Sequence, residues 1–152
     1  GIPLKILRPD IDLTLLDGTM KRLNFLGEVC GALKISARRV HKRAEEAGLD
    51  KTMRERYDLA TARAVAPMNV LAEYCLPLVK MKGYFIAMKG PGAAQELEEA
   101  ENALDTLGAG EPEVVSLTLP GGEERNLVIA QKLRFTPKGY PRHGGTIAKH
   151  PL

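Results

Sequence analysis

Short apolar runs alternate along this chain with longer stretches in which apolar residues recur at helical spacing. The candidate strands lie at residues 11–16, 39–41, 57–62 and 84–88. The candidate helices lie at residues 19–33, 67–78 and 97–107. A strand that pairs in parallel with the preceding one needs a crossover connection, which is usually a helix. The pattern therefore predicts the α/β fold class, with a mainly parallel sheet covered on both faces.

The last part of the chain has a different pattern, because its apolar residues alternate along two neighbouring runs. Residues 115–119 and 127–130 are separated by a Pro-Gly-Gly turn at 120–122. Alternation near a short glycine turn predicts a β-hairpin, which adds antiparallel strands to the sheet. The sequence contains no internal repeat and no low-complexity segment, so we expect a single domain over residues 1–152.

The charged residues are balanced in number but segregated along the chain. The sequence has 22 Lys and Arg against 19 Asp and Glu, a net charge of +3. Residues 34–43 contain five basic residues and no acidic one. Residues 90–124 contain acidic residues but no Lys or Arg, and no acidic residue follows Glu124. A basic tail of this kind is able to face the phosphates of RNA. A solvated surface is the alternative, and charge alone favours it, because the pI of 8.9 is below the value of about 9 that is typical of dedicated nucleic-acid binders.

The composition argues against several classes of protein. No apolar run approaches the ~20 residues that span a bilayer, and no signal-peptide pattern opens the chain, so we expect a cytoplasmic protein without a membrane partner. Cys30 and Cys75 lie on apolar helical stripes and are interpreted as core residues of a reduced protein. The three histidines are scattered and no paired Cys or His spacing occurs, so we expect no metal site.

Polar residues follow several of the candidate strands, and ligands of open parallel sheets bind beyond the carboxyl ends of the strands. Asp17 follows the first one, where a carboxylate is able to accept hydrogen bonds from both ribose hydroxyls of a nucleotide. Capping of the next helix explains Asp17 equally well. Ala44 and Glu45 follow the second candidate strand, where they suit contact with a purine, although a solvated Glu at a helix start is the commoner arrangement.

Basic residues follow the other two candidate strands. Arg63 stands between a strand and a helix that begins at Pro67, a position from which a guanidinium is able to grip phosphate or carboxylate. An ordinary surface ion pair is the alternative for Arg63. Lys89 has the equivalent position after residues 84–88. No Ser-His-Asp set and no phosphate-binding loop is visible, so an enzyme with this site works by positioning its reactants.

Five segments of the sequence, in order and without large gaps, resemble motifs of one known family. They are residues 17–26, 43–46, 62–71, 88–90 and 140–146. Residues 17–26 resemble the D-x-x-x-K-R-x-x-F-L segment of that family, and residues 62–71 resemble its strongest signature. On these motifs the chain is identified as a member of the glucose-inhibited division protein B family, which are bacterial 16S ribosomal RNA guanine-N7 methyltransferases.

The resemblance implies a Rossmann-like methyltransferase fold that binds S-adenosylmethionine. The residues it places at the cofactor are Asp17, Gly18 and Thr19 at the ribose, Ala44 and Glu45 at the adenine, and Arg63 in the cleft, where Arg63 is also the catalytic candidate. The candidates for RNA contact are Lys89, Lys138 and Arg142. The implied partner is 16S ribosomal RNA or the small ribosomal subunit, bound by a monomer. Because N7 of guanine carries a free lone pair, in-line attack on the sulfonium methyl needs no general base.

Two features depart from the family pattern. Family members carry a glycine-rich strand and turn directly before the segment that begins here at Gly1, and Lys42 stands where they have Gly. We therefore expect the natural polypeptide to extend upstream with this turn and with a first strand that lies mid-sheet. Two other functions stay open: an RNA-binding or ribosome-associated module that needs no cofactor, and an NAD-dependent enzyme, since Asp17 suits either ribose.

Overall fold

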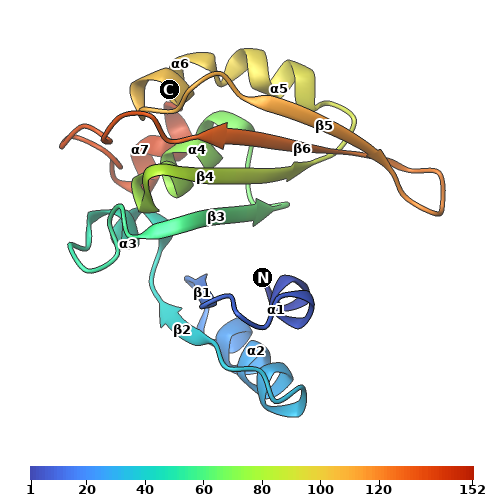
Figure 1. Ribbon diagram of the computed structural model, residues 1–152. Coiled ribbons are helices and arrows are strands. Elements are labelled where there is room, and N and C mark those ends of the chain that lie inside the picture. The colour runs from blue at the N-terminus through green and yellow to red at the C-terminus, as the bar shows by residue number, and fades with distance from the viewer. The chain divides into compact units, whose positions relative to one another are not determined.

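The computed structural model describes all residues from 1 to 152 and contains six β-strands and seven α-helices (Figure 1). The contacts between residues divide the chain into two compact units, which we call the N-terminal unit, Gly1–Glu46, and the C-terminal unit, Ala47–Leu152. Helix α3, Ala44–Leu49, contains the boundary. None of the helices is long and apolar enough to cross a membrane.

The N-terminal unit consists of two short parallel strands and two further helices. Its elements are α1 (Ile2–Leu7), β1 (Thr14–Asp17), α2 (Met20–Ala32) and β2 (Arg38–His41). Pro3 lies in the first turn of α1, where its missing N–H costs nothing because no helical acceptor is available there. β1 and β2 pair in parallel, with Asp17 opposite His41. The strand predicted at residues 11–16 and the helix predicted at 19–33 are therefore confirmed, with boundaries that differ by a few residues.

The C-terminal unit is built on a four-stranded mixed sheet with the strand order β3-β4-β6-β5 (Figure 1). The strands are β3 (Tyr57–Arg63), β4 (Val79–Lys89), β5 (Glu113–Thr118) and β6 (Glu124–Gln131). β3 and β4 pair in parallel, whereas β6 runs antiparallel to both β4 and β5. The predicted hairpin is confirmed, and Gly122 in its turn has a φ of 88°, a left-handed conformation that favours glycine. The predicted α/β class is confirmed as well.

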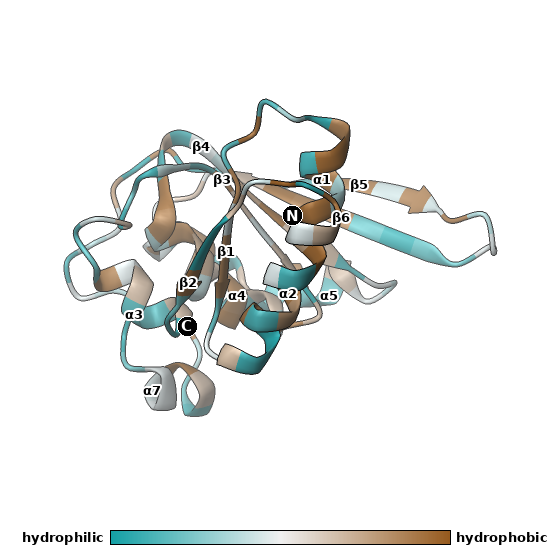
Figure 2. Cartoon of the chain, turned by 90° about the horizontal axis from the view of Figure 1, so that it is seen from below, coloured by the Kyte–Doolittle hydropathy of each residue, from teal (hydrophilic) through white to brown (hydrophobic).

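Helices pack against this sheet and form the core with it. They are α4 (Met68–Cys75), the 3-10 helix Leu76–Leu78, α5 (Ala93–Glu99), α6 (Glu101–Thr106) and α7 (Gly144–Lys149). Helix α4 contacts β3 and β4 as well as α5, α6 and α7. Phe85 and Ala87 on β4 are fully buried, and so are Val128 and Ala130 on β6. The alternate residue Ile86 is half-buried, and the outer part of β6 is hydrophilic (Figure 2).

Strand β4 is longer than the sequence predicts. The pattern predicts a turn at Gly83 before a strand at residues 84–88, but β4 continues through Gly83 back to Val79. A Cβ at Gly83 would lie 2.6 Å from the carbonyl oxygen of Asp58 on the neighbouring strand. The pairing of β3 with β4 shifts its register in this region, as at a β-bulge. Glycine therefore serves the close approach of two backbones here, and the prediction of a turn is wrong.

A buried lysine attaches the segment after β6 to the C-terminal unit. The ammonium of Lys132 donates hydrogen bonds to the carbonyl oxygen of Leu76, at 2.7 Å, and to the hydroxyl of Thr136. The carboxylate of Glu55 lies 3.6 Å from the same ammonium. Burial lowers the pKa of Lys132 to about 8, because the charged form loses solvation that these partners replace only in part.

Candidate functional site

The carboxyl ends of β1 and β2 lie at the same edge of the small parallel sheet, because Asp17 and His41 are its last paired residues. Asp17 is one of the predicted site residues, and its side chain is 20% exposed. One carboxylate oxygen accepts a hydrogen bond from the backbone N–H of Thr19 at 2.7 Å, and the other lies 3.3 Å from the guanidinium of Arg22. A carboxylate has about four acceptor positions. Asp17 therefore holds the loop before α2 and still has acceptor capacity for a ligand.

The loop between β1 and α2 is also held from the side of β2. Nε2 of His41 lies 3.1 Å from the carbonyl oxygen of Gly18, within hydrogen-bond distance. A Cβ at Gly18 would lie 3.0 Å from Cδ of Arg43, so a larger residue would displace that side chain. Thr19, the third residue predicted at the ribose, is the N-cap residue of α2 and makes no side-chain capping bond. The backbone of Gly18 and Thr19 thus lies next to Asp17, in the loop where the sequence predicts the ribose.

Ala44 and Glu45 open helix α3 directly after the loop that follows β2. Ala44 is half-buried, and the side chain of Glu45 is 11% exposed. Nε of Arg43 lies 3.4 Å from the Glu45 carboxylate. The interpretation of Glu45 as a solvated residue at a helix start is therefore wrong, because its side chain is buried. Asp17 and Glu45 give the N-terminal unit two carboxylates that are able to accept hydrogen bonds from a nucleoside.

In the C-terminal unit, Arg63 ends β3 opposite Met88 of β4. The side chain of Arg63 is exposed and makes no hydrogen bond or ion pair in the structure. The next residue, Ala64, has a φ of 53° in the left-handed region, which is costly for a residue other than glycine. Such backbone strain is common at functional sites. The surface ion pair considered for Arg63 is thus not formed, and its guanidinium is available to an anion.

Lys89 ends β4 but has a different environment. Its side chain is only 9% exposed, and its ammonium donates to the carboxylate of Glu96 at 2.6 Å and to the carbonyl oxygen of Ala66 at 2.9 Å. The same Glu96 oxygen accepts from the backbone N–H of Met68 at the start of α4. Lys89 and Glu96 together therefore fix the loop that follows Arg63. Sequence reasoning missed Glu96, because nothing local distinguishes it from the other acids of that helix.

The other two residues predicted to contact RNA also differ in environment. The guanidinium of Arg142 forms a bidentate pair with the fully buried carboxylate of Glu73, with nitrogen–oxygen distances of 2.6 and 3.0 Å. This pair raises the pKa of Arg142. Lys138 is exposed, and the structure gives it no hydrogen bond or ion pair. RNA contact by Lys89, Lys138 and Arg142 stays a prediction.

The available side chains suit binding and orientation. The structure contains no cluster of three or more His, Cys, Asp or Glu side chains that could hold a metal ion. Burial raises the pKa of the Cys75 thiol to about 12, so this residue stays a thiol in the core. The N-terminal unit supplies hydrogen-bond acceptors at Asp17 and Glu45, which are able to hold a nucleoside. The C-terminal unit supplies an unpaired guanidinium at Arg63, which is able to hold an anion.

The sequence matches a family model described as GidB, rRNA small subunit methyltransferase G, over residues 1–128. Among the curated relatives, the ribosomal RNA small subunit methyltransferase G of Lactobacillus johnsonii is 49% identical and that of Lactobacillus helveticus is 50% identical. Both matches cover 100% of this chain and 64% of the relative. The chain thus spans somewhat less than two thirds of the length of these relatives.

Solved structures with low sequence identity share the fold. An rRNA methylase from Streptococcus thermophilus superposes with a TM-score of 0.57 at 18% identity, covering 81% of this chain and 74% of the other. A methyltransferase from Pyrococcus furiosus gives a TM-score of 0.65 at 14% identity, covering 88% and 68%. A SAM-dependent O-methyltransferase from Thermotoga maritima gives 0.59 at 9% identity, covering 84% and 52%. The architecture is therefore that of the SAM-dependent methyltransferases.

Proposed function

Because this chain belongs to the rRNA small subunit methyltransferase G family, we propose that the protein transfers a methyl group from S-adenosylmethionine to N7 of a guanine in 16S ribosomal RNA. The observation that supports this most is the family match over residues 1–128, which includes every residue predicted to bind the cofactor. The polypeptide acts on 16S RNA or on the small ribosomal subunit as a cytoplasmic monomer.

The nucleoside part of S-adenosylmethionine fits the acceptors of the N-terminal unit. The Asp17 carboxylate, which keeps free acceptor capacity beside its bond to Thr19, holds the ribose hydroxyls. The adenine lies at Ala44 and Glu45, where the buried carboxylate accepts from an amino group. The backbone of Gly18 and Thr19 lines the ribose side. When bound, the cofactor supplies an electrophilic methyl group on a sulfonium centre.

The methyl acceptor needs little acid–base chemistry from the protein. N7 of guanine carries a lone pair, so no proton has to be removed before the attack. The side chains contribute by holding the acceptor in line with the methyl group and by excluding water. Arg63 binds a phosphate or the guanine through its guanidinium, which has no other partner, and Lys89 and Glu96 keep the adjoining loop in place. Lys138, which is exposed, adds a contact to the RNA, whereas Lys89 and Arg142 are already paired with Glu96 and Glu73 and act there through the elements that they hold.

The two sheets have open edges that suit further pairing. β1 pairs only with β2, and β3 pairs only with β4, so each of them leaves one edge of its backbone without a strand partner. We propose that residues 1–152 are part of one catalytic domain in which further strand pairing satisfies these edges. Buried backbone groups without partners would cost about 1–3 kcal/mol each.

The test compares the partly buried carboxylate of Asp17 with the exposed carboxylate of Asp10 in the same unit. Replacement of Asp17 by Ala should weaken binding of S-adenosylmethionine by about 1–3 kcal/mol, the range of a charge-assisted hydrogen bond. Asp10→Ala is the matched control, because Asp10 is exposed and pairs only with Arg8. Calorimetric titration with S-adenosylmethionine, and in parallel with NAD, measures the effect, and a thermal melt of each variant reports its folding.

Four results would contradict parts of the proposal. Unchanged affinity of the Asp17 variant for S-adenosylmethionine removes its role at the ribose, and a lowered melting temperature with normal affinity assigns it to the loop alone. Binding of NAD in preference to S-adenosylmethionine argues for an oxidoreductase.

For Arg63, the substitution Arg63→Lys keeps the charge and loses the planar fork, so methyl transfer to small-subunit RNA at saturating cofactor should fall. A fully active Lys variant would exclude recognition by the fork.

A further inference from the structure

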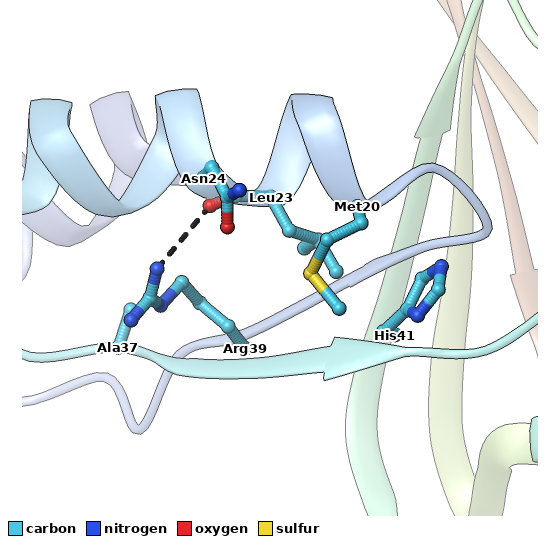
Figure 3. A pocket seen from close by; sticks show the side chains of 6 residues that line it. All are labelled: Met20, Leu23, Asn24, Ala37, Arg39 and His41. Carbon is cyan, nitrogen blue, oxygen red and sulfur yellow. Dashed lines mark hydrogen bonds between the residues drawn. The ribbon is translucent and has the colours of Figure 1, made fainter.

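A polar pocket of about 410 Å³ lies between α2 and β2 in the N-terminal unit (Figure 3). Its lining residues are Met20, Leu23 and Asn24 from the helix, and Ala37, Arg39 and His41 from β2 and the residue before it. Figure 3 shows the helix side chains pointing toward those of the strand. The pocket combines an apolar part, an amide, an imidazole and a guanidinium. Neither Asp17 nor Glu45 lines it, although His41 connects the pocket to the loop at Gly18.

Arg39 occupies its position in this pocket because of a glycine on the opposite helix. A Cβ at Gly27 of α2 would lie 2.0 Å from Nη1 and 2.7 Å from Cζ of Arg39. Only a residue without a side chain leaves room for the guanidinium there. The guanidinium makes a single long hydrogen bond, 3.4 Å to the carbonyl oxygen of Leu23, and no ion pair. Arg39 is thus a positioned cation that no carboxylate neutralises.

The stretch of sequence that contains Arg39 is cationic as well. Residues 34–43 contain Lys34, Arg38, Arg39, Lys42 and Arg43 and no acid. The N-terminal unit has nine Lys and Arg against six Asp and Glu, whereas the C-terminal unit has thirteen of each. The whole net charge of +3 therefore belongs to the unit that holds this pocket. β2 also lies at the edge of its sheet, since it pairs only with β1.

We propose that this pocket binds a backbone phosphate of the RNA substrate. The planar fork of Arg39 suits two phosphate oxygens, and the amide of Asn24 is a further donor at the same pocket. His41 uses one ring nitrogen toward Gly18, so the other is left for the ligand. Met20 and Leu23 give the adjoining sugar an apolar surface. The inference rests on the proposed function for one point only, the identity of the anion as RNA.

Two substitutions test the proposal in different ways. Arg39→Gln removes the cation. Gly27→Ala keeps every charge but displaces the guanidinium, and it does not weaken α2, because Ala is the better helix former. Arg8→Gln is the matched control, since Arg8 is an exposed arginine of the same unit whose charge Asp10 already neutralises. Fluorescence anisotropy with a labelled single-stranded RNA oligonucleotide, measured over a range of salt concentrations, gives affinity and salt dependence.

Both test variants should bind RNA about five- to tenfold more weakly at low salt, and Arg39→Gln should flatten the log–log salt slope by about 0.7, the value for one single-strand phosphate contact. The Arg8 variant should match the wild type. Circular dichroism confirms the fold of each protein. Inorganic phosphate at constant ionic strength serves as a second probe and should compete with RNA only in proteins that keep a positioned Arg39.

The outcomes separate this inference from the proposed function. If RNA affinity and slope are the same in the wild type and in both test variants, the phosphate site is excluded, even if the protein methylates RNA. An equal loss in the Arg8 variant also excludes it, since the effect would then be general electrostatics. If the protein does not bind S-adenosylmethionine but its RNA affinity still depends on Arg39 and Gly27, the proposed function fails and the RNA site stands.

Discussion

The two units of this chain differ in how many apolar residues they bury and in their net charge. The C-terminal unit buries most of the apolar residues of the molecule, including Phe85, Leu71 and Val128, around one mixed sheet. The N-terminal unit buries only Leu13, Leu23 and Cys30 among its apolar side chains. It carries the whole net charge, two candidate cofactor carboxylates and the Arg39 pocket. The apolar core and the net charge are therefore concentrated in different parts of the sequence.

The difference has a physical cause in the size of the sheets. Three or more strands with an apolar face, or packing against helices, are needed for a sheet to be stable by itself. The C-terminal unit meets this requirement, because α4, α5 and α6 complete its core. The N-terminal unit has two four-residue strands and leaves Leu7, Phe25 and Leu33 exposed. Its stability depends more on further packing than that of the C-terminal unit does.

The largest expected effect compares one phenylalanine from each unit. Phe85→Ala removes a fully buried ring from β4 and should lower the free energy of unfolding by about 3–5 kcal/mol, through lost burial and a cavity. Phe25→Ala removes a ring that is 62% exposed on α2 and should cost less than about 0.5 kcal/mol. Urea unfolding measures both. Equal costs would break the comparison and show that Phe25 is covered in the protein.

The buried charge of the C-terminal unit makes its stability depend on pH. Below pH 8, Lys132 is protonated in the folded and the unfolded state, so the penalty of its burial is fully present. Between about pH 8 and 10.5 the folded state loses this proton while the unfolded state keeps it, so stability rises with pH. The gain is at most about 3 kcal/mol. Unfolding measured from pH 7 to 10.5 tests this.

The control for this pH dependence is a second lysine of the same unit. The side chain of Lys80 is about half exposed and pairs with Asp58. Lys132→Met should abolish the rise in stability between pH 8 and 10.5, whereas Lys80→Met should leave it intact. A rise that survives in the Lys132 variant would assign the pH dependence to other groups.

The smallest expected effect compares two ion pairs. Glu73→Gln removes the charge from the buried partner of Arg142 and should cost about 2 kcal/mol, since hydrogen bonds to charged groups contribute roughly 1.5–3 kcal/mol. Asp10→Asn in the exposed pair with Arg8 should leave the free energy of unfolding almost unchanged, because solvent screens this pair. Thermal unfolding of the two variants measures the difference in stability. If both cost the same, the ion pairs do not distinguish the units.

Local patterns predicted most of the elements but not their long-range contacts. The alternation at residues 115–119 and 127–130 correctly predicted a hairpin, since period-two spacing and a glycine turn are local signals. Gly83 was misassigned, because a glycine in a turn and a glycine under a neighbouring strand look alike in sequence. The division into two units was not predicted either, because it depends on which strands pair and not on where they lie.

The residues of the candidate site that end strands were predictable from the sequence, whereas the contacts between elements were not. Asp17 and Arg63 were found because both end strands, and this position is visible in the sequence. Their roles at a cofactor came from the family motifs and stay a prediction. The network of Lys89 with Glu96 was not predicted, since ion pairs between elements leave no periodic pattern. Arg39 was not singled out from its basic run, because its position depends on a close approach to Gly27 of another element, which also leaves no periodic pattern.

The space that Gly27 leaves for Arg39 determines where the charge of that residue lies. A side chain at position 27 and the guanidinium of Arg39 in its present position exclude one another, but the exposed arginine is flexible and is able to turn away. A larger residue at position 27 therefore moves the cation without removing it. The sequence of α2 thus controls the direction of a charge that belongs to β2.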